Sequence, residues 1–285
     1  MKELKARLLI TGYTPKTIHS GYYRYMTLVL RNIDLDVYGV AFADPKPSGH
    51  GGQTIYINYR KDGHMHKSCQ IQSPWLSNPF GLNTSPIQEG EQPKYYVELS
   101  FGNAPSEYVE IFHNKMKALD KHVCESAILN QQKWLGKTDI DDDYRDEFLS
   151  ENYKSIVRHY RNKDKEETGE YPDTIRFKVP HYINKDEETG EESESFGDLE
   201  VYDANKNRIA IGTIEDLRNA LGRGNRVRVI VQCHSVWQSG DDFGVSWRVK
   251  RIQMIGQDND MGGECAFLGG SEEGEGGNSD EESYD

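Results

Sequence analysis

The chain has 285 residues with 47 acidic and 34 basic side chains, which gives a formal net charge of −13. No stretch approaches the roughly 20 apolar residues of a membrane span, and the first ten residues hold too short an apolar run for a signal peptide. The four cysteines show no CxxC spacing, so the composition argues against a secreted or membrane protein and favours the cytoplasm or nucleus.

The negative charge is concentrated in two segments. The last 28 residues, Asp258–Asp285, hold ten carboxylates and no Lys or Arg, and residues 186–198 hold seven more acids. Without the tail, the chain has 37 acidic and 34 basic residues. Without both segments, it has 30 acidic and 34 basic residues. This distribution leaves room for a basic face. We therefore divide the chain into a folded domain, residues 1–257, and a disordered acidic tail, residues 258–285.

Residues 1–120 are predicted to be mostly strands. Runs rich in β-branched and aromatic residues alternate with turn-forming clusters such as Pro45–Gly52. The predicted strands are Lys5–Thr11, Tyr22–Arg31, Val37–Phe42, Thr54–Tyr59, His66–Gln72 and Tyr95–Phe101. Between the last two, Ser73–Leu82 (SPWLSNPFGL) forms a rigid aromatic turn. Its Trp75 and Phe80 either stack on a nucleobase or close one end of a barrel.

A helical period begins at Pro105 and extends to Gln132. Its apolar residues recur at steps of three and four, as an amphipathic helix requires: Val109, Phe112, Met116, Leu119 and Val123. A second short helix is expected within Asp143–His159, and strands resume at Thr174–Val179. A third helical turn spans Thr213–Leu221, with Thr213 and Asp216 as its N-cap signal and Gly222 as its C-cap.

The last two predicted strands, Arg226–Trp237 and Phe243–Ile255, each have an apolar and a basic face. Alternation places one set of residues toward the core: Val227, Val229, Val231, Cys233, Val245, Trp247 and Val249. The opposite set is Arg226, Arg228, Ile230, Gln232, His234, Ser246, Arg248 and Lys250. The adjacent bases Lys250–Arg251 are expected to mark a β-bulge, after which Ile252 and Met254 return to the core.

This strand pair points to single-stranded nucleic acid. Phosphates need cations along a groove, and unpaired bases need flat aromatic faces, for which Trp237 and Phe243 are the candidates. The alternative is a solvated strand face on which both rings merely pack. The shorter basic and aromatic patches Arg158–Lys163 and Arg176–Lys178 either extend the phosphate track or are ordinary surface.

Signals for an enzyme are weak. His64, His66 and Cys69 have a spacing that suits zinc, but no second ligand cluster accompanies them. The carboxylates within Asp139–Asp143 either hold Mg²⁺, as in a nuclease, or form a solvated loop. Neither a P-loop nor a nucleophile elbow is present. We expect no catalytic residue, no metal and no cofactor.

The many short strands with a helical insertion favour a small β-barrel over alternating βαβ units. Several blocks resemble the single-stranded DNA-binding proteins of nucleo-cytoplasmic large DNA viruses, which are similar to phage replicative single-strand binders with acidic tails. The blocks are Ile71–Leu82 (IQSPWLSNPFGL), Leu119–Trp134 (LDKHVCESAILNQQKW), Tyr171–Val179 (YPDTIRFKV) and Val229–Val249 (VIVQCHSVWQSGDDFGVSWRV). One departure is the chain end, Tyr284–Asp285, where a terminal Phe is expected.

The resemblance implies a mainly β protein with an OB-fold barrel core, extra strands and inserted helices. It also implies sequence-independent binding of single-stranded DNA in viral replication, recombination or repair, in the host cytoplasm or nucleus. Combined with the strand faces, it gives these DNA-binding candidates: Arg226, Arg228, Gln232, His234, Trp237, Phe243, Arg248, Lys250, Arg251, Arg176, Lys178, Trp75 and Phe80.

The acidic tail is expected to compete with DNA for the cationic groove and, once displaced, to recruit a viral DNA polymerase or primase/helicase. Its partner-binding residues would be Glu272, Glu273, Glu275, Asp280, Glu281, Glu282, Tyr284 and Asp285. Homo-oligomer formation is left open. The rival hypothesis is a structural virion or scaffolding protein, in which the tail acts as a chaperone arm for basic partners.

Overall fold

The computed structural model describes residues 28–49, 51–85, 92–103, 105–161, 167, 169–186 and 189–255. The predicted strand Lys5–Thr11, the first part of Tyr22–Arg31 and the whole tail lie outside these residues. The helices are η1 (Asn32–Asp34), η2 (Val37–Gly39), α1 (Glu107–Leu129), α2 (Gln131–Trp134), α3 (Arg145–Asn152) and α4 (Ile214–Ala220). None of the helices in the described part of the chain is long and apolar enough to span a membrane.

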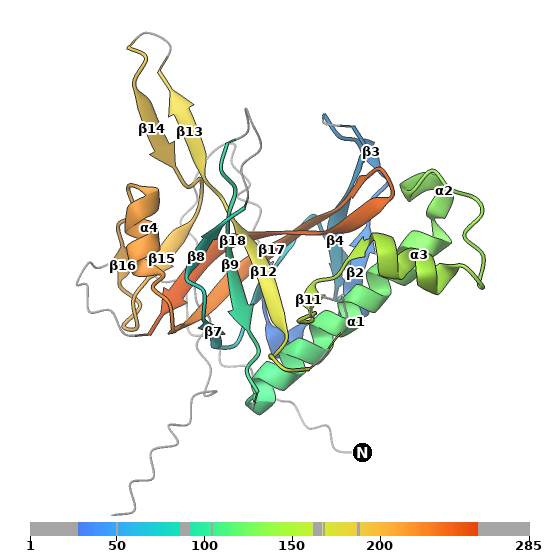
Figure 1. Cartoon of the computed structure of the whole chain (residues 1–285), viewed down its shortest axis with the longest axis horizontal. Coiled ribbons are helices and arrows are strands. Elements are labelled where there is room, and N and C mark those ends of the chain that lie inside the picture. Colours follow the sequence, from blue (N-terminus) through green and yellow to red (C-terminus); the bar gives the residue numbers. More distant parts are fainter. Residues whose placement is uncertain are drawn as a thin grey trace, which may run out of the picture.

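Strands dominate the structure, as Figure 1 shows. The first nine are β1 (Leu28–Arg31), β2 (Val40–Phe42), β3 (Lys46–Pro47), β4 (Gln53–Lys61), β5 (His64–His66), β6 (Cys69–Gln72), β7 (Leu76–Asn78), β8 (Leu82–Thr84) and β9 (Tyr95–Ser100). The others are β10 (Tyr153–Lys154), β11 (Val157–Arg158), β12 (Thr174–Val179), β13 (Tyr182–Lys185), β14 (Glu192–Ser195), β15 (Glu200–Tyr202), β16 (Arg208–Ile209), β17 (Asn225–Ser239) and β18 (Asp242–Met254).

Six strands close into a five-stranded barrel, in which β6 and β7 together take the place of one strand. β6 and β7 follow one another along the same edge of β17, joined by a bond from the Ser73 backbone N–H to the Val229 carbonyl. From there the ring runs through β9, β12 and β18 back to β17. All its pairs are antiparallel except β12 with β18, where Lys178 lies opposite Arg248. This five-stranded Greek-key closure is that of an OB-fold, which confirms the predicted mainly β class and barrel core.

The β17–β18 hairpin is longer than the barrel needs and crosses the whole molecule (Figure 1). Along its length β17 pairs with β7, β6 and β4, and β18 pairs with β15, β12 and β10. Both strands were predicted almost to their ends. The register shifts between Ile230 and Val231, opposite Lys250 and Arg251, so the expected bulge is confirmed.

Alternation correctly predicts most of the core face of this hairpin, including Trp247, Ile252 and Met254, all of which are buried. Val245, which was also assigned to the core, is only partly buried and lines a surface cleft. Ile230 was assigned to the basic face but is fully buried, because it packs with Tyr202 and Val29 from outside the barrel. A second register shift, between Cys233 and Ser235, leaves His234 without a partner on β18. After it the alternation reverses, so Val236 is buried and Trp237 is half-exposed.

The helices agree only partly with the sequence pattern. In α1 the five predicted core residues are buried, and Thr213 and Asp216 form a complete capping box on α4. The C-cap of α4 is Leu221 instead of Gly222. The helix expected within Asp143–His159 ends at Asn152, after which the chain forms β10 and β11. That change matters, because β10 and β11 form one wall of the site described next.

Candidate nucleic-acid interface

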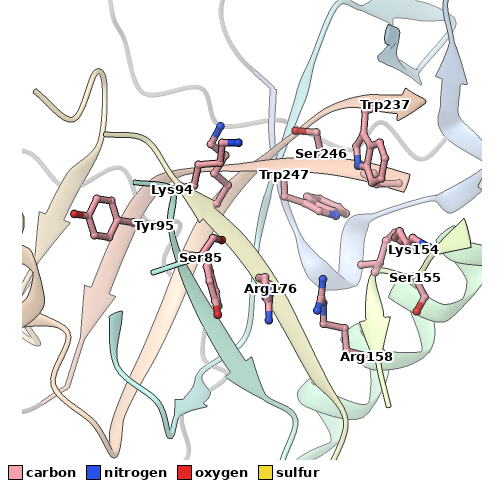
Figure 2. Close-up of a pocket in the computed structure, with 14 residues that line it drawn as sticks. Ser85, Lys94, Tyr95, Lys154, Ser155, Arg158, Arg176, Trp237, Ser246 and Trp247 are labelled. Atoms are coloured by element: carbon pink, nitrogen blue, oxygen red, sulfur yellow. The ribbon is translucent and has the colours of Figure 1, made fainter. Parts of the chain in front are cut away.

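A cleft of about 250 Å³ lies on the outer face of the barrel (Figure 2). It forms where β9, β12 and the half of the β17–β18 hairpin nearest its turn meet β10 and β11. Its lining residues are Ser85, Lys94, Tyr95, Tyr96, Lys154, Ser155, Ile156, Arg158, Arg176, Lys178, Trp237, Val245, Ser246 and Trp247. Hereafter "the cleft" means this set. Its base is the outward face of β12, because alternate residues Ile175, Phe177 and Val179 are buried in the barrel.

The cleft is strongly cationic. Five of its lining residues are bases, and no carboxylate lies among the described residues that line it. Lys154 and Arg176 have acidic partners at the edges of the cleft. Lys154 pairs with Asp242 at 2.7 Å, and Arg176 pairs with Glu98 at 2.7 Å. In the described part of the chain neither Arg158 nor Lys178 forms an ion pair with a carboxylate.

Lys178 lies in a cluster of like charges. Partial desolvation lowers the pKa of its ammonium group, and the charges of Arg248 and Lys94 lower it further. The side chain is nevertheless exposed to solvent and can be reached from the cleft. A cation held among other cations is stabilised when an anion approaches, so this cluster favours phosphate.

Arg158 and Arg176 form a second cationic pair from neighbouring strands, and both are visible in Figure 2. Partial desolvation lowers the pKa of Arg158, and the charge of Arg176 adds to this effect. Arg176 is held by two hydrogen bonds to Glu98, and its guanidinium lies 3.9 Å from the centre of the Tyr96 ring. The arrangement leaves Tyr96 as a half-exposed aromatic surface beside the cations.

The wall that carries Lys154 and Arg158 is fixed to α1 through Asp120. The Asp120 carboxylate accepts hydrogen bonds from the Tyr153 hydroxyl at 2.6 Å and from the backbone N–H groups of Ile156 and Val157. Burial raises the pKa of Asp120, and these three donors oppose that shift. One carboxylate thus positions the whole β10–β11 segment.

Trp237 contributes the second aromatic surface of the cleft, near the end of the hairpin. It lies opposite Gly244, which pairs on its other side with Lys154. A Cβ atom at position 244 would lie 2.9 Å from the Lys154 carbonyl oxygen and 3.3 Å from the Trp237 ring. Glycine is therefore what lets the indole and β10 approach the same point of β18.

Several predicted residues meet at this site. Arg176, Lys178 and Trp237 line the cleft, and Arg248 lies opposite Lys178. Gln232 pairs with Arg248 on the adjacent strand. Desolvation, together with the charges of Arg248 and Lys250, lowers the pKa of His234, so this imidazole is neutral at pH 7.

Three predicted residues do not line the cleft. Phe243 is fully buried against Phe148 and Tyr153, so it is a core residue and offers no face to a base. Lys250 is 7 % exposed and pairs with Asp198 at 2.7 Å. Arg251 pairs with Glu200 at 2.7 Å, on the side of the barrel where β15 joins β18.

Four other candidates lie away from the cleft. Arg226 and Arg228 are at the opposite end of β17, and Arg228 is about 30 Å from Trp237 along the strand. Arg228 lies over the Trp75 ring at 4.9 Å and donates to Gln253. Phe80, which is 47 % exposed, lines a second cavity.

Four residues of the site were not among the predicted candidates: Lys94, Tyr96, Lys154 and Asp120. Lys94 precedes a predicted strand and Tyr96 lies within it, and their alternation with buried Tyr95 and Val97 was a usable signal. Lys154 was missed because the sequence predicts a helix within Asp143–His159, where the structure has β10. Asp120 carries no signal, since a charged residue on a helix usually faces solvent.

The metal hypotheses receive no structural support. The described residues contain no group of three or more His, Cys, Asp or Glu side chains placed to hold a metal ion. Cys69 is buried in β6, whereas His64 is exposed on β5. Within Asp139–Asp143, Asp141 accepts from the Tyr144 backbone N–H and Asp142 pairs with Arg145.

No protein-family profile and no curated protein matches the chain. Among solved structures, the single-stranded DNA-binding protein from bacteriophage Enc34 in complex with ssDNA matches at 11% identity and a TM-score of 0.31, covering 77% of this chain and 98% of that chain. A C-terminal truncation of the same phage protein matches at 10% identity with the same TM-score, covering 76% of this chain and 95% of that one. These values are too low to carry properties of the phage protein over to this chain.

Proposed function

We propose that the protein binds single-stranded DNA in the cleft without sequence preference. The observation that carries this proposal is the cleft itself: five bases, no described carboxylate in its lining, and the aromatic surfaces of Tyr96 and Trp237. It lies on the outward face of β9 and β12, the second and third strands of the barrel, and beside the β17–β18 hairpin, the surfaces on which OB-folds bind oligonucleotides.

The cations and the aromatic rings have separate roles in this account. Lys94 and Lys178, together with Arg248 beside the cleft, bind backbone phosphates on one side, and Arg158 binds them on the other. Bases stack on Tyr96 and Trp237, which contributes about 1–3 kcal/mol per base and tolerates any sequence. Counterions released from the phosphates make the affinity decrease steeply with salt.

The biological setting is part of the proposal. A coat on single-stranded DNA serves viral replication, recombination or repair in the host cytoplasm or nucleus, and requires no catalysis. The tail, 258–285, with its ten carboxylates, would occupy the cleft when DNA is absent. Released by DNA, it would recruit a viral polymerase, primase or helicase, so that coating and recruitment are linked.

The proposal is tested by titrating a fluorescently labelled oligothymidine and a duplex of equal length with the full chain and with residues 1–257, over a salt series. We expect binding that prefers the single strand, weakens with salt and tightens on truncation at low salt. Equal affinity of the two proteins would refute the competition by the tail. Failure of both to bind at low salt would refute DNA binding and favour the scaffolding alternative.

A further inference from the structure

A second cavity, of about 700 Å³, lies beside the cleft on the same face of β9 and β12. Its volume is within the range of about 300–1,000 Å³ typical of ligand sites. The walls are mainly apolar and aromatic, formed by Pro79 and Phe80 on one side and by Tyr160, Tyr171 and Pro172 on the other. We call this cavity the aromatic pocket.

Three of its rings are unusually exposed. Phe80 is 47 % exposed, Tyr160 44 % and Tyr171 54 %. The two tyrosines contact each other edge to face, with ring centres 4.7 Å apart at 69°. Exposed aromatic clusters of this kind mark binding surfaces, because burial of these rings in the core would be more favourable than contact with water.

The aromatic pocket is continuous with the cleft. Arg158 lines both cavities. At the boundary, Glu98 lies in the pocket and Arg176 in the cleft, and the two are joined by an ion pair of 2.7 Å. Thr174 also donates to Glu98. The only described carboxylate lining either cavity is therefore already neutralised, so a phosphate chain meets no unpaired negative charge there.

Hydrogen bonds to Asp173 fix the backbone beside the aromatic pocket. Asp173 accepts hydrogen bonds from His159 Nδ1 at 2.6 Å and from His113 Nε2 of α1 at 2.8 Å. Its carbonyl accepts from the Phe101 backbone N–H. These bonds fix His159, which precedes Tyr160, and Asp173, which lies two residues after Tyr171. Both tyrosines are therefore preorganised, which lowers the entropy cost of binding.

We infer that the aromatic pocket takes nucleobases of the same DNA strand that occupies the cleft, with the backbone crossing at Arg158. This inference rests on the proposed function and adds to it. It defines a second base-stacking site, in which Tyr160, Tyr171 and Phe80 hold the bases, and it makes the bound strand longer than the cleft alone can cover.

The test compares oligothymidines of increasing length on the full chain and on the variants Tyr160→Ala and Tyr171→Ala. For oligomers long enough to reach the pocket, each variant is expected to weaken binding about fivefold or more, because one stacking contact is lost. The shortest oligomers that bind should show no change. The matched control is Tyr38→Ala, since Tyr38 is 76 % exposed and lines neither cavity.

Photocrosslinking provides a second measurement. Oligomers carrying one 5-iodouracil at successive positions are expected to crosslink to Tyr160, Tyr171 or Phe80 only near one end of the strand. Thermal unfolding of each variant separates misfolding from a lost contact. The inference is overturned if the variants bind oligomers of every length like the parent, if short and long oligomers lose affinity equally, or if crosslinks avoid the pocket.

These results are distinguishable from a failure of the proposed function. If the parent protein binds no oligomer, DNA binding itself is refuted and the inference with it. If the parent binds, Lys178→Glu abolishes binding and the tyrosine variants change nothing, then the cleft remains the DNA site and only the pocket is refuted.

Discussion

Lys178 illustrates how charge is organised around single residues in the cleft. Desolvation, Arg248 and Lys94 all lower the pKa of this lysine in the free protein. A bound phosphate stabilises the charged form and raises that pKa again. Where the free lysine is partly neutral, DNA binding must therefore take up a proton.

We expect the affinity for single-stranded DNA to decrease as the pH rises through the lowered pKa of Lys178, at a lower pH than for an ordinary lysine. In the variant Lys178→Arg the side chain stays charged, so this decrease should be absent or much smaller. The measurement is oligothymidine titration at constant ionic strength between about pH 7 and 10. Superimposable pH profiles for the two proteins would contradict this role.

Trp237 and Phe243 show what the sequence predicts at the scale of residues and where it stops. Both are aromatic and flank the same hairpin turn, and the sequence predicts the same base-stacking role for both. The structure separates them: Trp237 lines the cleft, whereas Phe243 is core. The cause is the register shift after Cys233, which reverses the alternation of β17, and a shift of that kind depends on partner strands that no local pattern reveals.

At the scale of elements, the β10–β11 segment is the part of the site that was hardest to predict. The helical pattern around Arg145 gives no sign that the chain leaves the helix at Asn152. What stabilises the extended conformation is non-local: strand pairing with β18 and β12, and the Asp120 carboxylate of α1. Long-range partners override local helical propensity here.

We expect Asp120→Asn to destabilise the fold and to weaken DNA binding severalfold. An amide cannot accept from all three donors, and each donor left unpaired costs about 1–3 kcal/mol. Each kcal/mol lost lowers Tm by about 2–4 °C for a domain of this size. The measurements are thermal unfolding by circular dichroism and oligothymidine titration at a temperature where the variant is folded.

Asp143→Asn is the matched control, since Asp143 is exposed and lies outside the cleft lining. It should change neither Tm nor affinity. The positioning role of Asp120 would be contradicted if its variant lost stability but, once folded, bound DNA like the parent.

At the scale of the whole molecule, the sequence predicts the class of fold better than its closure. Period-two alternation identifies β9, β12, β17 and β18, because each has one face buried in the barrel. The closure depends on pairs such as β12 with β18, about 70 residues apart in sequence. The strand pattern predicts a small barrel, but the OB-fold topology follows only from the family resemblance. The basic face was likewise predicted mainly on β17 and β18, whereas the five bases that line the cleft lie on β10, β11 and β12 and directly before β9.

The central claim is that the cleft is the DNA-binding surface, and a pair of charge reversals tests it most directly. Lys178→Glu and Lys121→Glu change the net charge equally, but Lys121 lies on α1, 76% exposed and outside the cleft. In titrations with labelled oligothymidine at low salt, we expect Lys178→Glu to lose most of the affinity and Lys121→Glu to bind nearly like the parent. Equal losses in both variants, or no loss in Lys178→Glu, would show that DNA binding does not depend on the cleft.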